Sequence, residues 1–226
     1  MLLVRLLTAR ESFGEMIARF GLGDATSKQP ARSLWLHAAS NGELNSAKAF
    51  LEKMRQTKTD NSIVITCNTM SGITLAKSLG YRARLAPLDY QWSVQMFRRI
   101  ENISEHITME SEIWPNRFAV LHKKRITIAV LGARLGSRTS KTWSKFPRLA
   151  SSTIAKIDFL SAQNSQSLER FQKFGLTKSA TGSVLNLKSF TVHPQYIPAH
   201  SMRANTCLAA STHSGEDEII IDAFSR

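Results

Sequence analysis

Cysteine, acidic residues and long apolar runs are all scarce in this chain of 226 residues. The two cysteines, Cys67 and Cys207, lie far apart without a CxxC spacing, which excludes a disulfide framework and is typical of a reducing cytosolic compartment. No segment approaches the roughly 18 consecutive apolar residues that a membrane-spanning helix needs. The histidines show no HExxH spacing, so we expect no bound metal.

Acidic residues are few, and they are also unevenly placed. Lys and Arg number 30 against 17 Asp and Glu, a formal charge of +13 that favours an anionic partner. No acid lies between Glu112 and Asp158. The basic residues of that window are Arg117, Lys123, Lys124, Arg125, Arg134, Arg138, Lys141, Lys145, Arg148 and Lys156. A phosphorylated lipid, an anionic membrane surface or nucleic acid would suit this charge. Nucleic acid is disfavoured because no aromatic residues alternate with the basic ones for base stacking, and no nucleic-acid-binding motif occurs.

Short apolar strands alternate with helical patterns along most of the chain. The expected strands are 34–36, 62–66, 82–86, 106–109, 125–131 and 157–160, with a last edge strand at 179–181. Strands separated by helices of this length predict an α/β fold with a mainly parallel, doubly wound sheet. The first strand is not followed by GxGxxG, which argues against a dinucleotide-binding enzyme.

Composition divides the chain into four parts. Residues 1–32 read as a basic amphipathic helix and a linker, and the helix either packs on the domain or lies on a membrane surface. Residues 33–186 form a Rossmann-like domain. Residues 187–205 are a polar linker with two prolines. Residues 206–226 contain an expected strand at 206–210 and a helix, which either pack on the first domain or begin a second domain that is truncated at Arg226.

Glu43 stands out because of its place in the first expected unit. It follows the strand 34–36 and the turn Ser40-Asn41-Gly42, and so lies on the first turn of a helix. Open α/β sheets bind ligands at the carboxyl ends of their strands, where a carboxylate can act as a general base. An acid in a first helical turn also complements the helix dipole, with Ser40 or Asn41 as an ordinary N-cap. The local pattern leaves both interpretations open.

Six short motifs occur in an order that resembles one known family. They are His37-Ala-Ala-Ser-Asn-Gly-Glu43, Met109-Glu-Ser-Glu-Ile-Trp-Pro-Asn116, Ala133-Arg-Leu135, Ala162-Gln-Asn164, Thr181-Gly-Ser183 and Ala210-Ser-Thr-His-Ser-Gly-Glu216. In these the chain resembles the 3-deoxy-D-manno-octulosonic acid (Kdo) transferases of lipopolysaccharide synthesis. The resemblance implies a GT-B glycosyltransferase. This chain would hold its N-terminal Rossmann-like domain, which binds the acceptor, and the first βα unit of the domain that binds CMP-Kdo.

The resemblance also implies roles for particular residues. Glu43 would be the general base that deprotonates the 6′-hydroxyl of the lipid A precursor in an inverting transfer, and Glu110 would act in the transition state. The residues implied to bind the acceptor are Ser40, Asn41, Gly42, Glu112, Arg134 and Arg138, and those implied to bind the donor are His213 and Glu216. Arginine suits the acceptor's phosphates because its guanidinium can bind phosphate through two hydrogen bonds. No cofactor or metal is implied beside CMP-Kdo, and the protein would lie on the cytoplasmic face of the inner membrane.

Three departures from the family qualify this expectation. Where the family has a lysine two residues after Thr-Gly-Ser, this chain has Leu185, and Lys188 is out of register. The family's N-terminal membrane span is reduced to residues 1–7, and its later nucleotide-binding stretches lie beyond residue 226. We therefore expect little or no unaided transferase activity. The alternative is a basic membrane-peripheral module that binds anionic lipid without catalysis.

Overall fold

The computed structural model describes residues 12–22, 32–57, 62–190, 206, 208–210 and 212–224. The chain divides into two compact units, residues 1–191 and 192–226. The sheet and the helices that cover it belong to the first unit, and the helix α10 (Glu216–Phe224) belongs to the second.

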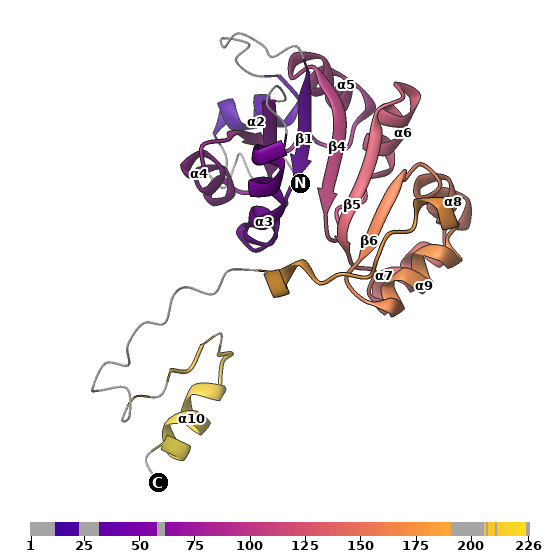
Figure 1. Cartoon of the computed structure of the whole chain (residues 1–226). Coiled ribbons are helices and arrows are strands. Elements are labelled where there is room, and N and C mark those ends of the chain that lie inside the picture. The colour runs from indigo at the N-terminus through magenta and orange to yellow at the C-terminus, as the bar shows by residue number, and fades with distance from the viewer. Residues whose placement is uncertain are drawn as a thin grey trace. The chain divides into compact units, whose positions relative to one another are not determined.

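The first unit is built on a single sheet of six strands (Figure 1). The strands are β1 (Ser33–His37), β2 (Ser62–Cys67), β3 (Arg82–Leu85), β4 (Ile103–Met109), β5 (Thr127–Ala133) and β6 (Phe159–Ala162). Their order is β3-β2-β1-β4-β5-β6, and every neighbouring pair is parallel. The predicted parallel, doubly wound sheet is confirmed.

Helices cover both faces of this sheet. They are α2 (Phe13–Arg19), α3 (Asn41–Thr57), α4 (Met70–Ser78), α5 (Gln91–Ile100), α6 (Pro115–Lys123), α7 (Ser137–Ser144), α8 (Pro147–Ile154) and α9 (Ser165–Lys173). Apolar residues of α3 and α4 pack on one face, and those of α5, α6, α8 and α9 pack on the other. Because both faces are covered, the central strands place apolar side chains on both sides: Trp35 and Val64 lie in one core, and Leu36 and Ile65 in the other.

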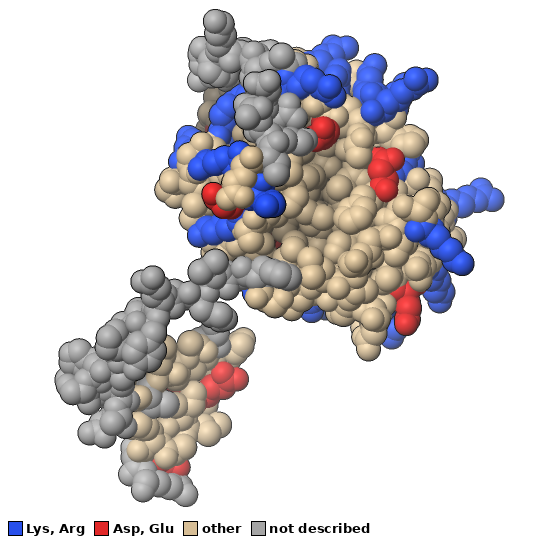
Figure 2. Space-filling view, in the orientation of Figure 1, with Lys and Arg blue, Asp and Glu red and all other residues tan. Residues whose placement is uncertain are grey.

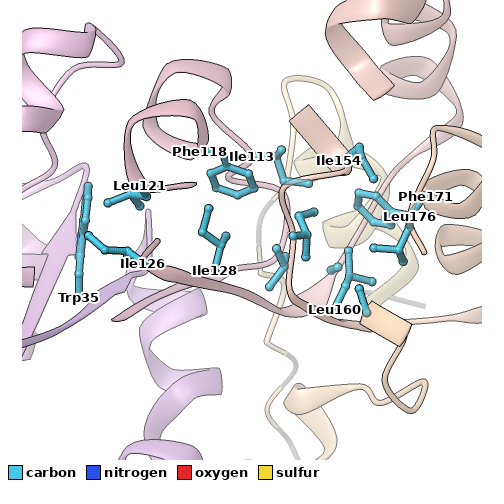
Figure 3. Close-up of a cluster of buried hydrophobic side chains, with 14 of the residues drawn as sticks. Trp35, Ile113, Phe118, Leu121, Ile126, Ile128, Ile154, Leu160, Phe171 and Leu176 are labelled. Atoms are coloured by element: carbon cyan, nitrogen blue, oxygen red, sulfur yellow. The ribbon is translucent and has the colours of Figure 1, made fainter. Parts of the chain in front are cut away.

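The larger of the two cores lies between β1, β4–β6 and the helices α5, α6, α8 and α9. In Figure 3, Phe118, Ile154 and Phe171 reach from α6, α8 and α9 toward Ile128 and Leu160 of the sheet. All five side chains are almost completely buried. This rigid layer fixes the positions of β4 and β5, whose carboxyl ends carry the site described below.

The end of the first unit differs from the prediction. The edge strand expected at 179–181 is wrong: Lys178–Ala180 is a turn of 3-10 helix, joined to the sheet by one isolated bridge between Leu160 and Thr181. The Thr177 hydroxyl accepts the backbone N–H of Ala180 at 3.3 Å, which winds the chain into a turn.

The second unit matches its predicted secondary structure only in part. Its predicted helix is confirmed as α10, but Thr206 and residues 208–210 are irregular, so the strand predicted there is absent from them. A single strand without a neighbour has no partner for its backbone hydrogen bonds, which is a physical reason for this difference.

The amphipathic N-terminal helix is described from residue 12 onward, and this part packs on the first unit. Arg19 is buried, its carbonyl accepts the Ser93 hydroxyl at 2.9 Å, and Phe20 stacks on Trp92 with ring centroids 5.2 Å apart. Residues 1–11 lie outside the described residues. Among the helices that the structure describes, none combines the length and the apolar character needed to cross a bilayer.

Candidate active site

The strand order places the predicted carboxylates on the two sides of one crevice. The sheet grows from β1 toward β2 and β3 on one side, and from β4 toward β5 and β6 on the other, so the order of strand addition reverses between the parallel neighbours β1 and β4. Such a switch point, at the carboxyl ends of the strands, is where open α/β sheets bind ligands. Glu43 follows β1, whereas Glu110 and Glu112 follow β4. The fold therefore brings together acids that lie nearly 70 residues apart in the sequence.

Glu43 is held on the first turn of α3 by its own loop. Its carboxylate accepts the backbone N–H of Ala39 at 2.8 Å, and its N–H donates to the Ser40 hydroxyl at 3.3 Å. Burial, and to a smaller extent the charges of Glu112 and Glu110, raises the pKa of Glu43 to about 7, against the opposing effects of the Ala39 hydrogen bond and the charge of Lys188. A carboxylate with a pKa near neutrality suits a general base that works at physiological pH.

Glu110 is held in an unusual backbone conformation. Its φ is +49°, in the left-handed region that residues other than glycine rarely adopt. Its N–H donates to the Leu131 carbonyl at 2.9 Å, so the sheet's hydrogen bonding extends to this residue. Its carboxylate forms an ion pair with Lys188, Nζ to Oε1 3.0 Å. Strain of this kind concentrates at functional sites.

Lys188 reaches the site through a short 3-10 turn, Leu187–Phe190. The side chain of Asn186 accepts the Lys188 N–H at 3.1 Å, and Leu187 packs with the core on the α3 side of the sheet. Gly132, next to Leu187, has a φ of +61°, in the left-handed region that favours glycine. Lys188, which is out of register in the sequence, thus stands beside Glu110, whereas Leu185 donates its backbone N–H to Ala162.

Glu112 is committed to partners within the protein. Its carboxylate accepts Trp114 Nε1–H at 2.7 Å and lies 3.3 Å from His37 Nε2. Thr66 accepts the indole N–H of Trp35, and His37 Nδ1 lies 2.9 Å from the Thr66 hydroxyl and 3.1 Å from the Thr66 carbonyl oxygen. Glu112 therefore anchors the loop after β4, and its role in acceptor binding stays a prediction.

The proton balance of this pair follows from its surroundings. Burial, then the charge of Arg117, lowers the pKa of His37 to about 4. Burial would raise the pKa of Glu112, but the hydrogen bond and charge of His37, with Trp114 and Arg117, lower it to about 2. At neutral pH Glu112 is therefore a carboxylate that accepts a hydrogen bond from neutral His37.

Arg117 belongs to the basic window between Glu112 and Asp158, but unlike most basic residues of that window it is buried. The guanidinium is buried beneath the site, 4.9 Å from the centroid of the Trp35 ring. Burial lowers its pKa to about 10, and the nearby charges of Asp89 and Glu112 oppose this shift. Arg117 thus contributes a buried charge to the crevice. The arginines and lysines of α7 and α8, which belong to the same basic window, are exposed. On the face of the first unit seen in Figure 2, Lys and Arg side chains far outnumber acidic ones.

The other predicted acceptor residues surround the crevice. Ser40, Asn41 and Gly42 are exposed in the turn before Glu43, and the Ser40 hydroxyl caps α3. Arg134 is exposed just after β5, where its N–H lies 3.4 Å from the Glu110 carbonyl. Arg138 is exposed on the first turn of α7.

The predicted donor residues belong to the second unit. Glu216 accepts the His213 N–H at 2.8 Å, and its carboxylate lies 3.5 Å from His213 Nδ1. Both side chains are exposed, and this arrangement caps α10. Among the described residues, no group of three His, Cys, Asp or Glu side chains is placed to hold a metal ion.

The architecture defines a class of protein. A doubly wound sheet in the order 3-2-1-4-5-6, with acids at its switch point, is a Rossmann-like domain of the GT-B type. Two solved structures support this fold assignment: a UDP-N-acetylglucosamine 2-epimerase (TM-score 0.51, 9% identity, 79% of this chain and 55% of that one) and S. aureus MnaA with UDP (TM-score 0.52, 9% identity, 77% of this chain and 51% of that one). At this identity the likeness shows the fold alone.

The sequence comparisons identify the family. Residues 14–191 match the family profile described as 3-deoxy-D-manno-octulosonic-acid transferase (kdotransferase), so the chain belongs to the Kdo transferase family. It is 28% identical to the enzyme of that name from Haemophilus influenzae over 90% of this chain and 50% of the relative. The Aquifex aeolicus enzyme is 28% identical over 85% and 50%. The chain thus spans about half the length of these curated relatives.

Proposed function

We propose that this chain is the acceptor-binding half of a glycosyltransferase that transfers Kdo from CMP-Kdo to a phosphorylated lipid A precursor. The observation that carries the proposal is Glu43. It lies at the switch point of the sheet on the first turn of α3, and its pKa is raised to about 7. Family membership supplies the donor and acceptor classes, since the named relatives are Kdo transferases.

The reaction requires a base because a sugar hydroxyl is a weak nucleophile at neutral pH. As the acceptor's 6′-oxygen bonds to the anomeric carbon of Kdo, the bond from that carbon to the phosphate oxygen of CMP breaks. The hydroxyl proton passes to the Glu43 carboxylate, and CMP leaves with the bonding electrons. The attack on the face opposite the leaving group inverts the anomeric centre. Glu43 is protonated in about half of the molecules near pH 7, so the rate should rise with pH through an inflection there.

The charged neighbours have complementary roles in this proposal. Glu110 and Lys188, paired at 3.0 Å, face the reacting groups and balance charge as the glycosidic bond breaks. Arg134 and Arg138 bind the acceptor's phosphates, while Ser40, Asn41 and Gly42 form the turn against which the sugar lies. No metal or further cofactor takes part.

The donor half and the membrane setting belong to the same proposal. His213 and Glu216 begin the side that contacts CMP-Kdo, and the protein works at the cytoplasmic face of the inner membrane, where its lipid acceptor lies. The exposed basic residues of α7 and α8 support contact with an anionic surface. Because the chain spans half of its relatives, efficient donor binding requires the remainder of the donor domain.

Mass spectrometry of the transfer product tests the proposal. The chain is incubated with CMP-Kdo and the tetraacylated, bisphosphorylated lipid A precursor, with and without the donor domain of the Aquifex aeolicus relative. Kdo-modified lipid should form when the donor domain is supplied, and the rate of transfer should rise with pH through an inflection near pH 7. Glu43→Gln should bind the lipid normally but lower the transfer rate at least about 100-fold, the usual contribution of a general base.

The matched control is Glu52→Gln, an exposed acid on the same helix α3, which should leave the rate unchanged. Lipid binding without transfer under both conditions would instead favour a non-enzymatic lipid-binding module. An unchanged rate in Glu43→Gln would exclude Glu43 as the base.

A further inference from the structure

An apolar groove opens beside the candidate active site. Its walls come from the start of α6, the end of α7 and the start of α8: Ile113, Trp114, Pro115, Thr142, Trp143, Phe146, Leu149 and Ala150. The groove has a volume of about 260 Å³. Three of its apolar side chains are exposed, Trp114 by 39%, Phe146 by 61% and Leu149 by 52%. Contiguous exposed apolar surface of this kind marks an interaction site.

The groove continues toward the carboxylates. An adjoining hollow of about 170 Å³ shares Ile113, Trp114 and Trp143 with it and reaches Ser111 and Arg134. The Ser111 hydroxyl donates to the Arg134 carbonyl at 2.9 Å, and the Trp114 indole donates to Glu112. The same wall that anchors the loop after β4 therefore forms one side of the groove.

The rim of the groove is positively charged. Arg134 lines its inner end, and Arg138, Lys141, Lys145 and Arg148 are exposed on the helices α7 and α8 that form its wall. This segment of the sequence contains no acid. An apolar channel bordered by cations complements a ligand that joins hydrocarbon to negative charge, such as a phosphorylated lipid.

We infer that this groove binds a fatty acyl chain of the phosphorylated glycolipid acceptor, with Arg134 against a phosphate at the inner end. The inference rests on the proposed function and adds a site for the acceptor's hydrocarbon. The acyl chain lies along Trp114, Trp143, Phe146 and Leu149, which fixes the distance between the membrane-embedded part of the lipid and Glu43. The groove thereby selects an acylated acceptor over its deacylated sugar.

Binding titrations on the full chain test this inference. The probes are the tetraacylated, bisphosphorylated lipid A precursor, the same disaccharide bisphosphate without acyl chains, and vesicles of phosphatidylglycerol. Phe146→Ser/Leu149→Ser removes two exposed walls of the groove without entering the core. It should weaken binding of the acylated precursor about tenfold or more, since each lost contact removes buried apolar area, and leave binding of the deacylated disaccharide unchanged.

Met70→Ser, an exposed apolar residue at the start of α4, is the matched control and should change neither affinity. Equal affinity of the unaltered chain for acylated and deacylated precursor would overturn the groove while leaving the acceptor assignment intact. If the unaltered chain bound neither the acylated precursor nor the deacylated disaccharide, both the groove and the acceptor assignment would be overturned. An equal loss on phosphatidylglycerol vesicles would show a general membrane contact and would also overturn the inference.

Discussion

At the scale of residues, two carboxylates of one crevice have opposite proton affinities. Burial raises the pKa of Glu43 to about 7, whereas the hydrogen bonds from His37 and Trp114 overcome burial and lower the pKa of Glu112 to about 2. Neighbouring acids whose environments separate their pKa values in this way divide their roles. Glu43 is available to take a proton, and Glu112 remains a fixed charge that orients the loop after β4.

Glu112→Gln should lower stability in a pH-dependent way. The folded pKa of Glu112, about 2, lies below the ordinary glutamate value of 4.5, so its contribution is complete above pH 4.5 and is lost as the pH falls through 2. Urea unfolding at pH 7 should show a loss on the order of 3 kcal/mol, and this difference should disappear toward pH 2.

Glu169→Gln, an exposed acid on α9, serves as the control and should show no such pH dependence. If the stability loss of Glu112→Gln were the same at pH 7 and at low pH, the charged interaction of Glu112 with its partners would be refuted.

The sequence predicts some of these residues and misses others. Glu43 could be found because it follows an expected strand and turn, and Glu110 because it lies in a motif that resembles the family. His37 was part of a recognised motif, but its bond to Glu112 joins residues of different βα units, which no local pattern reveals. Lys188 was out of register, and only the 3-10 turn after Asn186 brings it to Glu110.

At the scale of elements, apolar periodicity was sufficient for the central sheet. Each of the six strands from β1 to β6 lies where a β-branched or apolar run predicted one, within a few residues at its ends. The strand predicted at 179–181 is wrong because a local hydrogen bond to the Thr177 hydroxyl competes with strand pairing. Periodicity also left open whether the N-terminal helix packs or meets a membrane, since both require the same apolar stripe.

The docking of α2 can be tested at Gly21, which ends that helix. Gly21 has a φ of +76°, and a Cβ there would lie 2.2 Å from the Ser93 carbonyl oxygen. Gly21→Ala should destabilise the protein by roughly 3 kcal/mol, because both the backbone and the contact with α5 would be strained. Thermal unfolding monitored by circular dichroism measures this loss.

Gly136→Ala is the control for this substitution. A Cβ at Gly136 meets nothing within 4 Å and its φ is negative, so stability should hardly change. Equal melting temperatures for Gly21→Ala and the unaltered chain would mean that α2 does not pack against α5 as described.

At the scale of the whole molecule, the order of the strands determines where the candidate site lies, whereas the net charge does not. The formal charge of +13 predicted an anionic partner without locating its site. Strand order could not be read from the sequence, yet it creates the switch point that joins Glu43 to Glu110. Family membership covers residues 14–191, so the acceptor side rests on both fold and family. Its relatives are about twice as long as this chain, and the donor side is therefore tested best by supplying that domain.

The crevice raises the pKa of Glu43 to about 7, which lets Glu43 act as a general base near neutral pH. Carbon-13 NMR of glutamate side-chain carboxyls in the full chain measures this directly as pH is varied. One resonance should titrate near pH 7, disappear in Glu43→Gln and move to higher pH in Lys188→Met, because the lysine's charge lowers the pKa of Glu43. A Glu43 resonance that titrates near the ordinary glutamate value of 4.5, unaffected by Lys188→Met, would show that Glu43 is not a base near neutrality.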